Sequence, residues 1–334
     1  MKNMNKIIYI FILFFVILAT LISCAKKESK SKVDSNPQLF NAVGFSGTIL
    51  NSKDGINWKK STWNSLNYGP SKNLSGITYG KSTYVAVGWH STIIASSDGN
   101  NWNDSSEGDL WRKCGEWNCK DKVQLSKAKY ANNNFVVVGI NGIILSSPDG
   151  TTWTKRNSGV GDYLSDVTYG KDKFVVVGNR TVLTSSDLNS WTQRVNVFDW
   201  ERVTPPSNFL SAVNFGNNIF VVVGWSGRIL TSHDGIQWTE RSSGTSNNLK
   251  DVIFENGSFL VVGHSGTILS STDGITWSKM SSGTTKILNG VAYGNNIYVV
   301  VGDLGTILTS PDGITWTERD SGKSNYLSGV TFSR

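Results

Sequence analysis

Residues 288–322 of this 334-residue chain read LNGVAYGNNIYVVVGDLGTILTSPDGITWTERDSG. The stretch contains four short runs rich in valine, isoleucine, threonine and tyrosine, at residues 288–293, 297–302, 306–310 and 314–319. Turn residues separate the runs: Gly-Asn-Asn, Asp-Leu-Gly and Pro-Asp-Gly. β-Branched and aromatic residues between such turns are typical of strands, and no part of the stretch has the period of a helix. We therefore predict a unit of four short strands.

The same unit recurs along most of the chain, which is typical of a repeat architecture. Its last turn contains an aspartate with a serine two residues before it and a tryptophan four residues after it. The seven copies have their aspartates at Asp54, Asp98, Asp149, Asp187, Asp234, Asp273 and Asp312, and their tryptophans at Trp58, Trp102, Trp153, Trp191, Trp238, Trp277 and Trp316. Seven copies of a four-stranded unit predict seven blades.

The first and last copies complement each other. The first copy begins at Phe40 with FNAVG and lacks the strand that opens the other copies, whereas residues 327–332, LSGVTF, match that missing strand. A C-terminal strand that completes the N-terminal blade closes a ring and leaves no long unpaired edge. An open solenoid would need capping repeats instead. We predict an all-β, seven-bladed β-propeller of four-stranded antiparallel blades over residues 38–334, a monomeric ring, in preference to a β-helix or a sandwich.

Residues 310–316, SPDGITW, resemble the Asp-box (BNR) hairpin of sialidase-type and photosystem II assembly factor propellers. The usual family pattern is Ser-x-Asp-x-Gly-x-Thr-Trp, so this chain is one residue shorter between Asp and Trp. The residues favour a structural role for all seven hairpins: Asp accepts from backbone N–H groups, Gly adopts a positive φ, and Trp packs between blades. In the fourth copy Leu188 replaces the glycine, and we expect a locally different hairpin there.

The N-terminus has the pattern of an export signal. Lys2 and Lys6 precede an apolar run over residues 7–22 that is short for a membrane span. Residues 21–24, Leu-Ile-Ser-Cys, resemble a bacterial lipobox, which implies that residues 1–23 are a lipoprotein signal peptide and that Cys24 carries lipid. Residues 24–37 then form a flexible tether. We expect a lipid-anchored protein of the bacterial cell envelope, in the outer membrane of a diderm host and facing the periplasm or the surface; an uncleaved anchor helix is the alternative.

Charge and cysteine usage argue against several classes of function. The formal charge is +7, of which two lysines belong to the signal segment, so the remaining chain carries 7 − 2 = +5. It has no basic run of the kind that tracks nucleic acid. Cys114 and Cys119 predict a local disulfide in an oxidising compartment. The three histidines, His90, His233 and His264, lie in different copies, so we expect no metal site, and we expect no cofactor.

Differences between the copies mark one face of the predicted ring. Extra length falls in the connection from the fourth strand of one blade to the first strand of the next, chiefly at residues 103–124 and 195–209. This connection emerges on the same face as the turn between the second and third strands, which also varies. The aromatic and histidine side chains that fall there are Trp63, Trp89, His90, Trp111, Trp117, Trp200, Trp225 and His264. We interpret them as candidate binding residues, with packing of the loops onto the ring as the alternative.

The first strands are expected to line the centre of the ring. Residues that alternate with their buried valines and aromatics should face a central tunnel: Lys127, Lys129, Asp166, Asn214, Asp251 and Thr331. Catalytic sialidases combine an arginine triad with a tyrosine and carboxylates, and they carry an Arg-Ile-Pro signature that this chain lacks. A carboxylate pair for glycoside hydrolysis would have to come from Asp166 and Asp251, and nothing around them indicates tuned acidity. We predict that the protein is not an enzyme.

Two kinds of function remain. The first is a non-catalytic, lipid-anchored envelope protein that binds a protein partner, or acts as a scaffold, through the variable face; the resemblance to assembly-factor propellers implies such a role. The second is a cell-surface carbohydrate-binding propeller or, less favoured, a sialidase-like glycoside hydrolase. The membrane and a protein are thus the expected partners, a glycan is the alternative, and nucleic acid is not expected.

Overall fold

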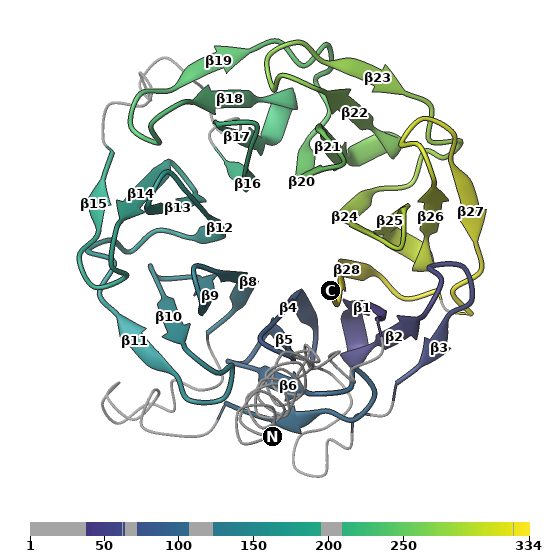
Figure 1. Ribbon diagram of the computed structural model, residues 1–334, viewed down its shortest axis with the longest axis horizontal. Coiled ribbons are helices and arrows are strands. Elements are labelled where there is room, and N and C mark those ends of the chain that lie inside the picture. Colours follow the sequence, from purple (N-terminus) through teal and green to yellow (C-terminus); the bar gives the residue numbers. More distant parts are fainter. Residues whose placement is uncertain (1–37, 62, 64–71, 107–122, 195–208, 323) are drawn as a thin grey trace, which may run out of the picture. The chain divides into compact units, whose positions relative to one another are not determined.

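The computed structural model describes residues 38–61, 63, 72–106, 123–194, 209–322 and 324–334. These residues form seven four-stranded antiparallel sheets, arranged as blades around a common centre (Figure 1). The predicted seven-bladed β-propeller is confirmed. Several sequence-based predictions lie outside the described residues, namely those for residues 1–37, which include Cys24, and those for Trp111, Cys114, Trp117, Cys119 and Trp200.

Each blade runs outward from the centre, from its first strand to its fourth (Figure 1). For blades 1 to 7, the first strands are β28 (Leu327–Phe332), β4 (Leu74–Gly80), β8 (Leu125–Ala131), β12 (Leu164–Gly170), β16 (Leu210–Gly216), β20 (Leu249–Glu255) and β24 (Leu288–Gly294). The second strands are β1 (Phe40–Gly44), β5 (Thr83–Gly88), β9 (Asn134–Gly139), β13 (Lys173–Gly178), β17 (Ile219–Gly224), β21 (Ser258–Gly263) and β25 (Ile297–Gly302).

The outer half of each blade has shorter strands. The third strands are β2 (Ile49–Ser52), β6 (Ile93–Ser96), β10 (Ile144–Ser147), β14 (Thr181–Ser185), β18 (Ile229–Ser232), β22 (Ile268–Ser271) and β26 (Ile307–Ser310). The fourth strands are β3 (Lys59–Lys60), β7 (Asn103–Asp104), β11 (Thr154–Arg156), β15 (Thr192–Gln193), β19 (Thr239–Arg241), β23 (Ser278–Met280) and β27 (Thr317–Arg319). Because residues 103 and 104 form β7, the insertion after blade 2 begins beyond Asp104.

Blade 1 is assembled from both ends of the propeller. β28 pairs antiparallel with β1, with Phe332 opposite Phe40 and Val330 opposite Ala42. Beyond the strand end, the Ser333 N–H donates to the Leu39 carbonyl over 3.0 Å, and the Leu39 N–H donates to Ser333 Oγ over 2.8 Å. This pairing satisfies the inner edge of β1, which would otherwise be open. The C-terminal strand therefore closes the ring, as the sequence predicts.

The hydrophobic core lies between the blades, in seven clusters. One cluster joins Val85 and Val87 of β5 to Phe135 and Val137 of β9 in the next blade. The second strands bury both of their faces because a neighbouring blade covers each side, which explains their unbroken valine runs. The hairpin tryptophans belong to the same clusters, where they are buried or half-buried.

The aspartate of each repeated hairpin organises its turn through one carboxylate. In blade 7, Asp312 Oδ1 accepts hydrogen bonds from the N–H groups of Ile314 and Thr315 and from Ser310 Oγ, each over 2.8 Å. The Ser310 hydroxyl also accepts from the Gly313 N–H over 2.8 Å, and Gly313 has a φ of +73°. The Thr315 and Ile314 N–H groups and the Ser310 hydroxyl lower the pKa of Asp312 to about 2.

Blade 4 keeps this hairpin geometry although Leu188 stands in place of the glycine. Leu188 has a φ of +66°, and Asp187 Oδ1 accepts from the N–H groups of Asn189 and Ser190, each over 2.9 Å. The expectation of a different hairpin is therefore wrong. A left-handed leucine costs roughly 1–2 kcal/mol, but this side chain is buried in the core between blades 3 and 4, which offsets the strain. Blade 4 differs instead at residues 179–180, a turn one residue shorter than its counterparts.

We expect Asp312→Asn to destabilise the protein at neutral pH and to lose this effect in acid. Asparagine keeps an acceptor oxygen but not the charge. The wild-type carboxylate contributes stability above its unfolded pKa near 3.9, and this contribution disappears as the pH falls through the folded value of about 2. Urea unfolding at several pH values should show a difference in unfolding free energy that shrinks between pH 4 and pH 2.

The matched control is Asp172→Asn, at an exposed turn aspartate, for which little difference is expected at any of these pH values. A constant difference between Asp312→Asn and wild type from pH 7 to pH 2 would contradict a role for the charge.

Candidate functional site on the loop-rich face

Two kinds of segment meet on one face of the ring, which we call the loop-rich face: the turns between second and third strands, and the connections that enter the first strands. In all seven blades the N–H of the first turn residue donates to the carbonyl of the residue before the first strand. Phe45 donates to Tyr326 over 2.9 Å, and Trp225 donates to Phe209 over 3.0 Å. This bond holds both side chains next to the innermost strand of their blade.

A glycine at the end of each second strand makes this approach possible. A Cβ at Gly44 would lie 1.9 Å from the Tyr326 carbonyl oxygen, and a Cβ at Gly302 would lie 2.1 Å from that of Ile287. Real Cβ contacts are never so short, so any side chain there would push the connection away. The recurring Val-Val-Val-Gly sequence thus builds the core with its valines and the loop-rich face with its glycine.

Four exposed apolar side chains lie on the turns and connections of blades 7, 1 and 2, and we call them the exposed apolar patch: Leu304, Tyr326, Phe45 and Trp89. Their exposed fractions are 56%, 43%, 37% and 38%, respectively. The Phe45 ring lies 5.2 Å from the Tyr326 ring and 6.2 Å from the Trp89 ring, centroid to centroid. The turn that contains Leu304 packs against β28, the strand that follows Tyr326. Large apolar side chains gathered on a monomer surface usually mark a contact site.

A second aromatic group lies over blades 4 and 5 and consists of Tyr163, Phe209 and Trp225. The Phe209 ring lies 5.4 Å from the Tyr163 ring and 5.2 Å from the Trp225 ring. All three side chains are half-buried. Burial raises the pKa of the Tyr163 hydroxyl, and the Ser126 hydroxyl offsets part of this effect. We call this set the blade 4–5 aromatic group.

Some of the predicted candidate binding residues are exposed, as a binding role requires, and others pack against the ring. Trp89 and His90 are exposed. Trp225 is half-buried against Phe209, and His264 is half-buried in blade 6. Trp63 packs onto the core between blades 1 and 2, where its ring would lie 3.2 Å from a Cβ at Gly47. The position of Trp63 therefore favours the packing interpretation for this residue.

Sequence reasoning missed the partners of these tryptophans. Phe45 takes in blade 1 the turn position that Trp89 takes in blade 2, but the predicted set contains only tryptophans and histidines. Tyr326 directly precedes the closing strand, so its position beside Phe45 depends on ring closure. Tyr163 and Phe209 directly precede a first strand, and Leu304 is the second residue of a turn, so their positions in the repeat could have identified them.

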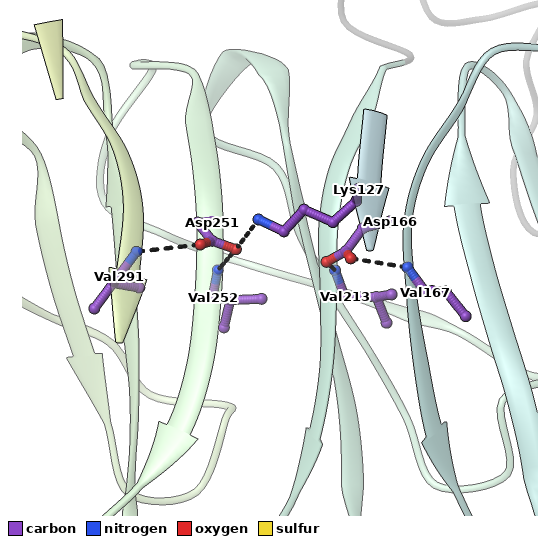
Figure 2. Close-up of polar contacts among 7 residues, drawn as sticks. All are labelled: Lys127, Asp166, Val167, Val213, Asp251, Val252 and Val291. Atoms are coloured by element: carbon purple, nitrogen blue, oxygen red, sulfur yellow. Dashed lines mark hydrogen bonds and ion pairs between the residues drawn. The ribbon is translucent and has the colours of Figure 1, made fainter. Parts of the chain in front are cut away.

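The centre of the ring contains an ion pair that spans it (Figure 2). Lys127 of β8 in blade 3 reaches Asp251 of β20 in blade 6, with Nζ 3.1 Å from Oδ1. Their side chains are 15% and 5% exposed. Burial alone would lower the pKa of Lys127, but the carboxylates of Asp251 and Asp166 more than offset this and raise it. Lys127 is therefore a cation held across the ring.

Both central carboxylates also join neighbouring first strands. Asp166 accepts from the Val167 N–H of its own blade over 2.8 Å and from the Val213 N–H of blade 5 over 3.1 Å (Figure 2). Asp251 does the same with Val252 and Val291, over 3.1 and 3.2 Å. Burial raises the pKa of Asp166, and Lys129 and Lys127 offset only part of this.

Asp251 faces the centre as expected, since it pairs there with Lys127. Both aspartates are nevertheless buried, and each also accepts a backbone N–H of the next blade, because each first strand leaves N–H groups that need an acceptor. The other residues expected at the tunnel, Lys127, Lys129, Asn214 and Thr331, are half-buried.

A charged group lies on the loop-rich side of this ion pair, at blades 6 and 7; we call it the Lys250 group, and it comprises Lys250, His264, Asn289 and Asp303. Each first strand from blade 2 to blade 7 has a bulge after its leucine, and Lys250 and Asn289 are the bulged residues of blades 6 and 7. Bulges redirect side chains and are common next to functional sites. Asn289 Nδ2 donates to Asp303 Oδ1 over 2.8 Å.

Burial lowers the pKa of the Lys250 ammonium; Asp303 opposes this shift, and Lys127 adds to it. Burial and the neighbouring Lys250 charge also lower the pKa of His264. The Lys250 group thus contains a cation in an environment that disfavours its charge.

Within the described ranges, no three His, Cys, Asp or Glu side chains are placed to hold a metal ion. A search of the same ranges also finds no helix with the length and apolar character needed to cross a membrane.

These features define a seven-bladed β-propeller with a variable, partly apolar face. Residues 196–327, about 40% of the chain, match the model of a family described as the DUF6242 beta propeller domain. No curated protein matches the sequence.

Solved structures show the same fold at low sequence identity. YCF48 from Cyanidioschyzon merolae is 16% identical, with a TM-score of 0.58 over 76% of this chain and 86% of that one. A structure titled "YCF48 bound to D1 peptide" is 14% identical, with a TM-score of 0.64 over 84% and 89%. The WD40 β-propeller domain of Doa1 is 12% identical, with a TM-score of 0.58 over 83% and 88%. Such similarity establishes the fold.

We expect Lys127→Met to lower the unfolding free energy by about 3 kcal/mol, because it removes the charge that pairs with a buried carboxylate. Lys286→Met is the control, since its ion pair with Glu318 is exposed and should contribute at most about 1 kcal/mol. The double variant Lys127→Met/Asp251→Asn should lose less unfolding free energy than the two single variants together, and the difference should exceed about 1 kcal/mol. Urea unfolding measures all four variants. Equal effects of Lys127→Met and Lys286→Met would show that the central ion pair is unimportant.

Proposed function

We propose that this protein is a non-catalytic, lipid-anchored protein of the bacterial cell envelope whose loop-rich face binds a protein partner. The observation that carries the proposal is the exposed apolar patch. The Phe45 ring packs against the rings of Tyr326 and Trp89, so the aromatic part of the patch is a continuous surface, and Leu304 lies on the neighbouring turn of blade 7. Trp and Tyr side chains are common at the centres of protein interfaces because they bury large areas with few rotatable bonds.

The structural similarities support a protein partner by analogy. A propeller of this fold, YCF48, has been solved with a D1 peptide bound. The repeated hairpin also resembles the Asp-box of assembly-factor propellers. From these proteins we infer by analogy only that one face of such a ring can bind a polypeptide.

The chemistry of the carboxylates supports a non-catalytic role. Asp166 and Asp251 each accept two backbone N–H groups, and Asp251 also pairs with Lys127. A general acid or nucleophile must be free to change its proton or its bonding partner. Carboxylates with this many fixed donors are suited to joining strands.

Anchoring is proposed from the N-terminal sequence. Cys24 in Leu-Ile-Ser-Cys would carry the lipid, residues 25–37 would be the tether, and Cys114 and Cys119 would be disulfide-bonded outside the cytoplasm. We expect metabolic labelling with an alkyne fatty acid to modify the wild-type protein and not Cys24→Ala. Labelling of Cys24→Ala at the wild-type level would refute the anchor.

Carbohydrate binding is a second candidate because the exposed Trp89 ring could stack on a sugar face. A glycan array with the full-length protein separates the two proposals. Glycan binding that Trp89→Ala abolishes would favour this candidate.

The binding face is tested with a triple variant, Phe45→Ala/Trp89→Ala/Tyr326→Ala. We expect it to lose most of the partner that wild type retains in an affinity purification from native membranes, since hot-spot aromatics contribute roughly tenfold or more each. The matched control replaces three exposed isoleucines of the hairpin turns on the opposite face, Ile56, Ile275 and Ile314, by alanine. Partner loss in the control but not in the triple variant would overturn the proposal.

A further inference from the structure

The Lys250 ammonium is the central observation. In the part of the chain that the structure describes, no residue forms an ion pair or a hydrogen bond with it. The two nearby carboxylates are already engaged: Asp251 by Lys127 and two backbone N–H groups, and Asp303 by Asn289. Asp303 and Asp251 attract the Lys250 ammonium without a direct contact, and its pKa is still lowered by burial. A half-buried cation without a hydrogen-bonded partner is costly, so the site favours an external anion.

The surroundings indicate what carries that anion. Lys250 belongs to blade 6, between the blade 4–5 aromatic group on one side and the exposed apolar patch of blades 7, 1 and 2 on the other. Figure 1 shows these blades in consecutive order around the ring. A polypeptide that follows the ring from one aromatic set to the other by way of blade 6 passes over Lys250 with the middle of the segment rather than with its end.

The ion pair beneath limits how deep the anion reaches. Lys127 and Asp251 span the centre of the ring (Figure 2). Lys250 precedes Asp251 in β20 and so lies one residue nearer the loop-rich face, from which that strand is entered. An anion that enters from the loop-rich face therefore meets Lys250 before it meets this ion pair. Lys127 already forms an ion pair with Asp251, so Lys250 is the cation that an external anion would pair with.

We propose that Lys250 pairs with an acidic side chain of the protein partner, in a segment whose residues on both sides of that carboxylate are apolar and lie on the two aromatic sets. This inference rests on the proposed function, protein binding through the loop-rich face, and adds the chemistry that is recognised. His264 lies near the Lys250 ammonium, and the Asn289 amide donates to the Asp303 carboxylate beside it. The apolar contacts supply most of the buried area, and the ion pair sets the register of the segment.

The test uses the full-length lipoprotein in nanodiscs and three sets of synthetic dodecapeptides. The first set has one central Glu flanked by Leu, Phe and Val at varied spacing, with acetylated and amidated ends. The second set has Gln in place of Glu. The third set has the central Gln and a free C-terminal carboxylate. Fluorescence anisotropy measures binding of each set to wild type, Lys250→Met and Lys250→Arg.

We expect wild type to bind the best Glu peptides about ten- to a hundredfold more tightly than their Gln counterparts, the range for a hydrogen bond to a charged group. Lys250→Met should remove this preference, and Lys250→Arg should retain it. Lys286→Met, a paired lysine, should leave it unchanged. Thermal unfolding of each variant checks that the ring is intact.

The remaining outcomes separate the inference from the proposed function. Equal binding of the Glu and Gln sets, or a preference that survives in Lys250→Met, overturns the inference. If Trp89→Ala weakens the binding of both the Glu and the Gln peptides in that case, the proposed function stands and only the inference about Lys250 fails. Lys250-dependent binding of only the third set would assign the site to a chain end and contradict our assignment to a side chain. No binding by any set contradicts the inference, and retention of the native partner by the triple alanine variant contradicts the proposed function.

Discussion

The antiparallel pairing of β28 with β1 is the constraint on which the rest of the structure depends. It joins residues almost three hundred positions apart, as the Leu39–Ser333 hydrogen bonds show. Without it, blade 1 would lack its inner strand, and the core cluster between blades 7 and 1 would lose Leu327 and Val330 of β28. Because each blade buries its faces only against its neighbours, closure completes a core that no single blade possesses. It also places Tyr326 beside Phe45 and so forms part of the exposed apolar patch.

The two faces of the ring differ in how much their turns vary from blade to blade. On one face, seven aspartates bind the backbone of their own turns, and the depressed pKa values of Asp273 and Asp312, about 2 each, follow from those hydrogen bonds. These turns are uniform because their geometry is determined within the turn. On the loop-rich face, the backbone bond between turn and connection fixes only the position of the side chain. The residue type at this turn position is free to vary, and aromatic, aliphatic, amide and charged residues all occur there.

Much of the fold could be predicted from the sequence because it is local and repeated. The Ser-x-Asp-Gly-x-x-Trp hairpin, the valine runs and the incomplete first copy are all visible in the chain. Leu188 shows the limit of a local rule, since tertiary burial allows a leucine to take a glycine conformation. The Lys127–Asp251 pair could not be predicted, because it joins blades 3 and 6 across the centre and depends on the radius of the ring. For the same reason, the grouping of Phe45, Trp89 and Tyr326 follows from closure, whereas Trp89 alone was identifiable from its position in a turn.

The central claim is that the loop-rich face contacts the partner and the hairpin face does not. Photo-crosslinking in cells tests it directly, with p-benzoylphenylalanine placed at position 89 or at position 314, an exposed hairpin residue on the opposite face. The account predicts a discrete protein adduct from position 89 and none from position 314. Adducts from position 314 alone, or the same adducts from both positions, would contradict it.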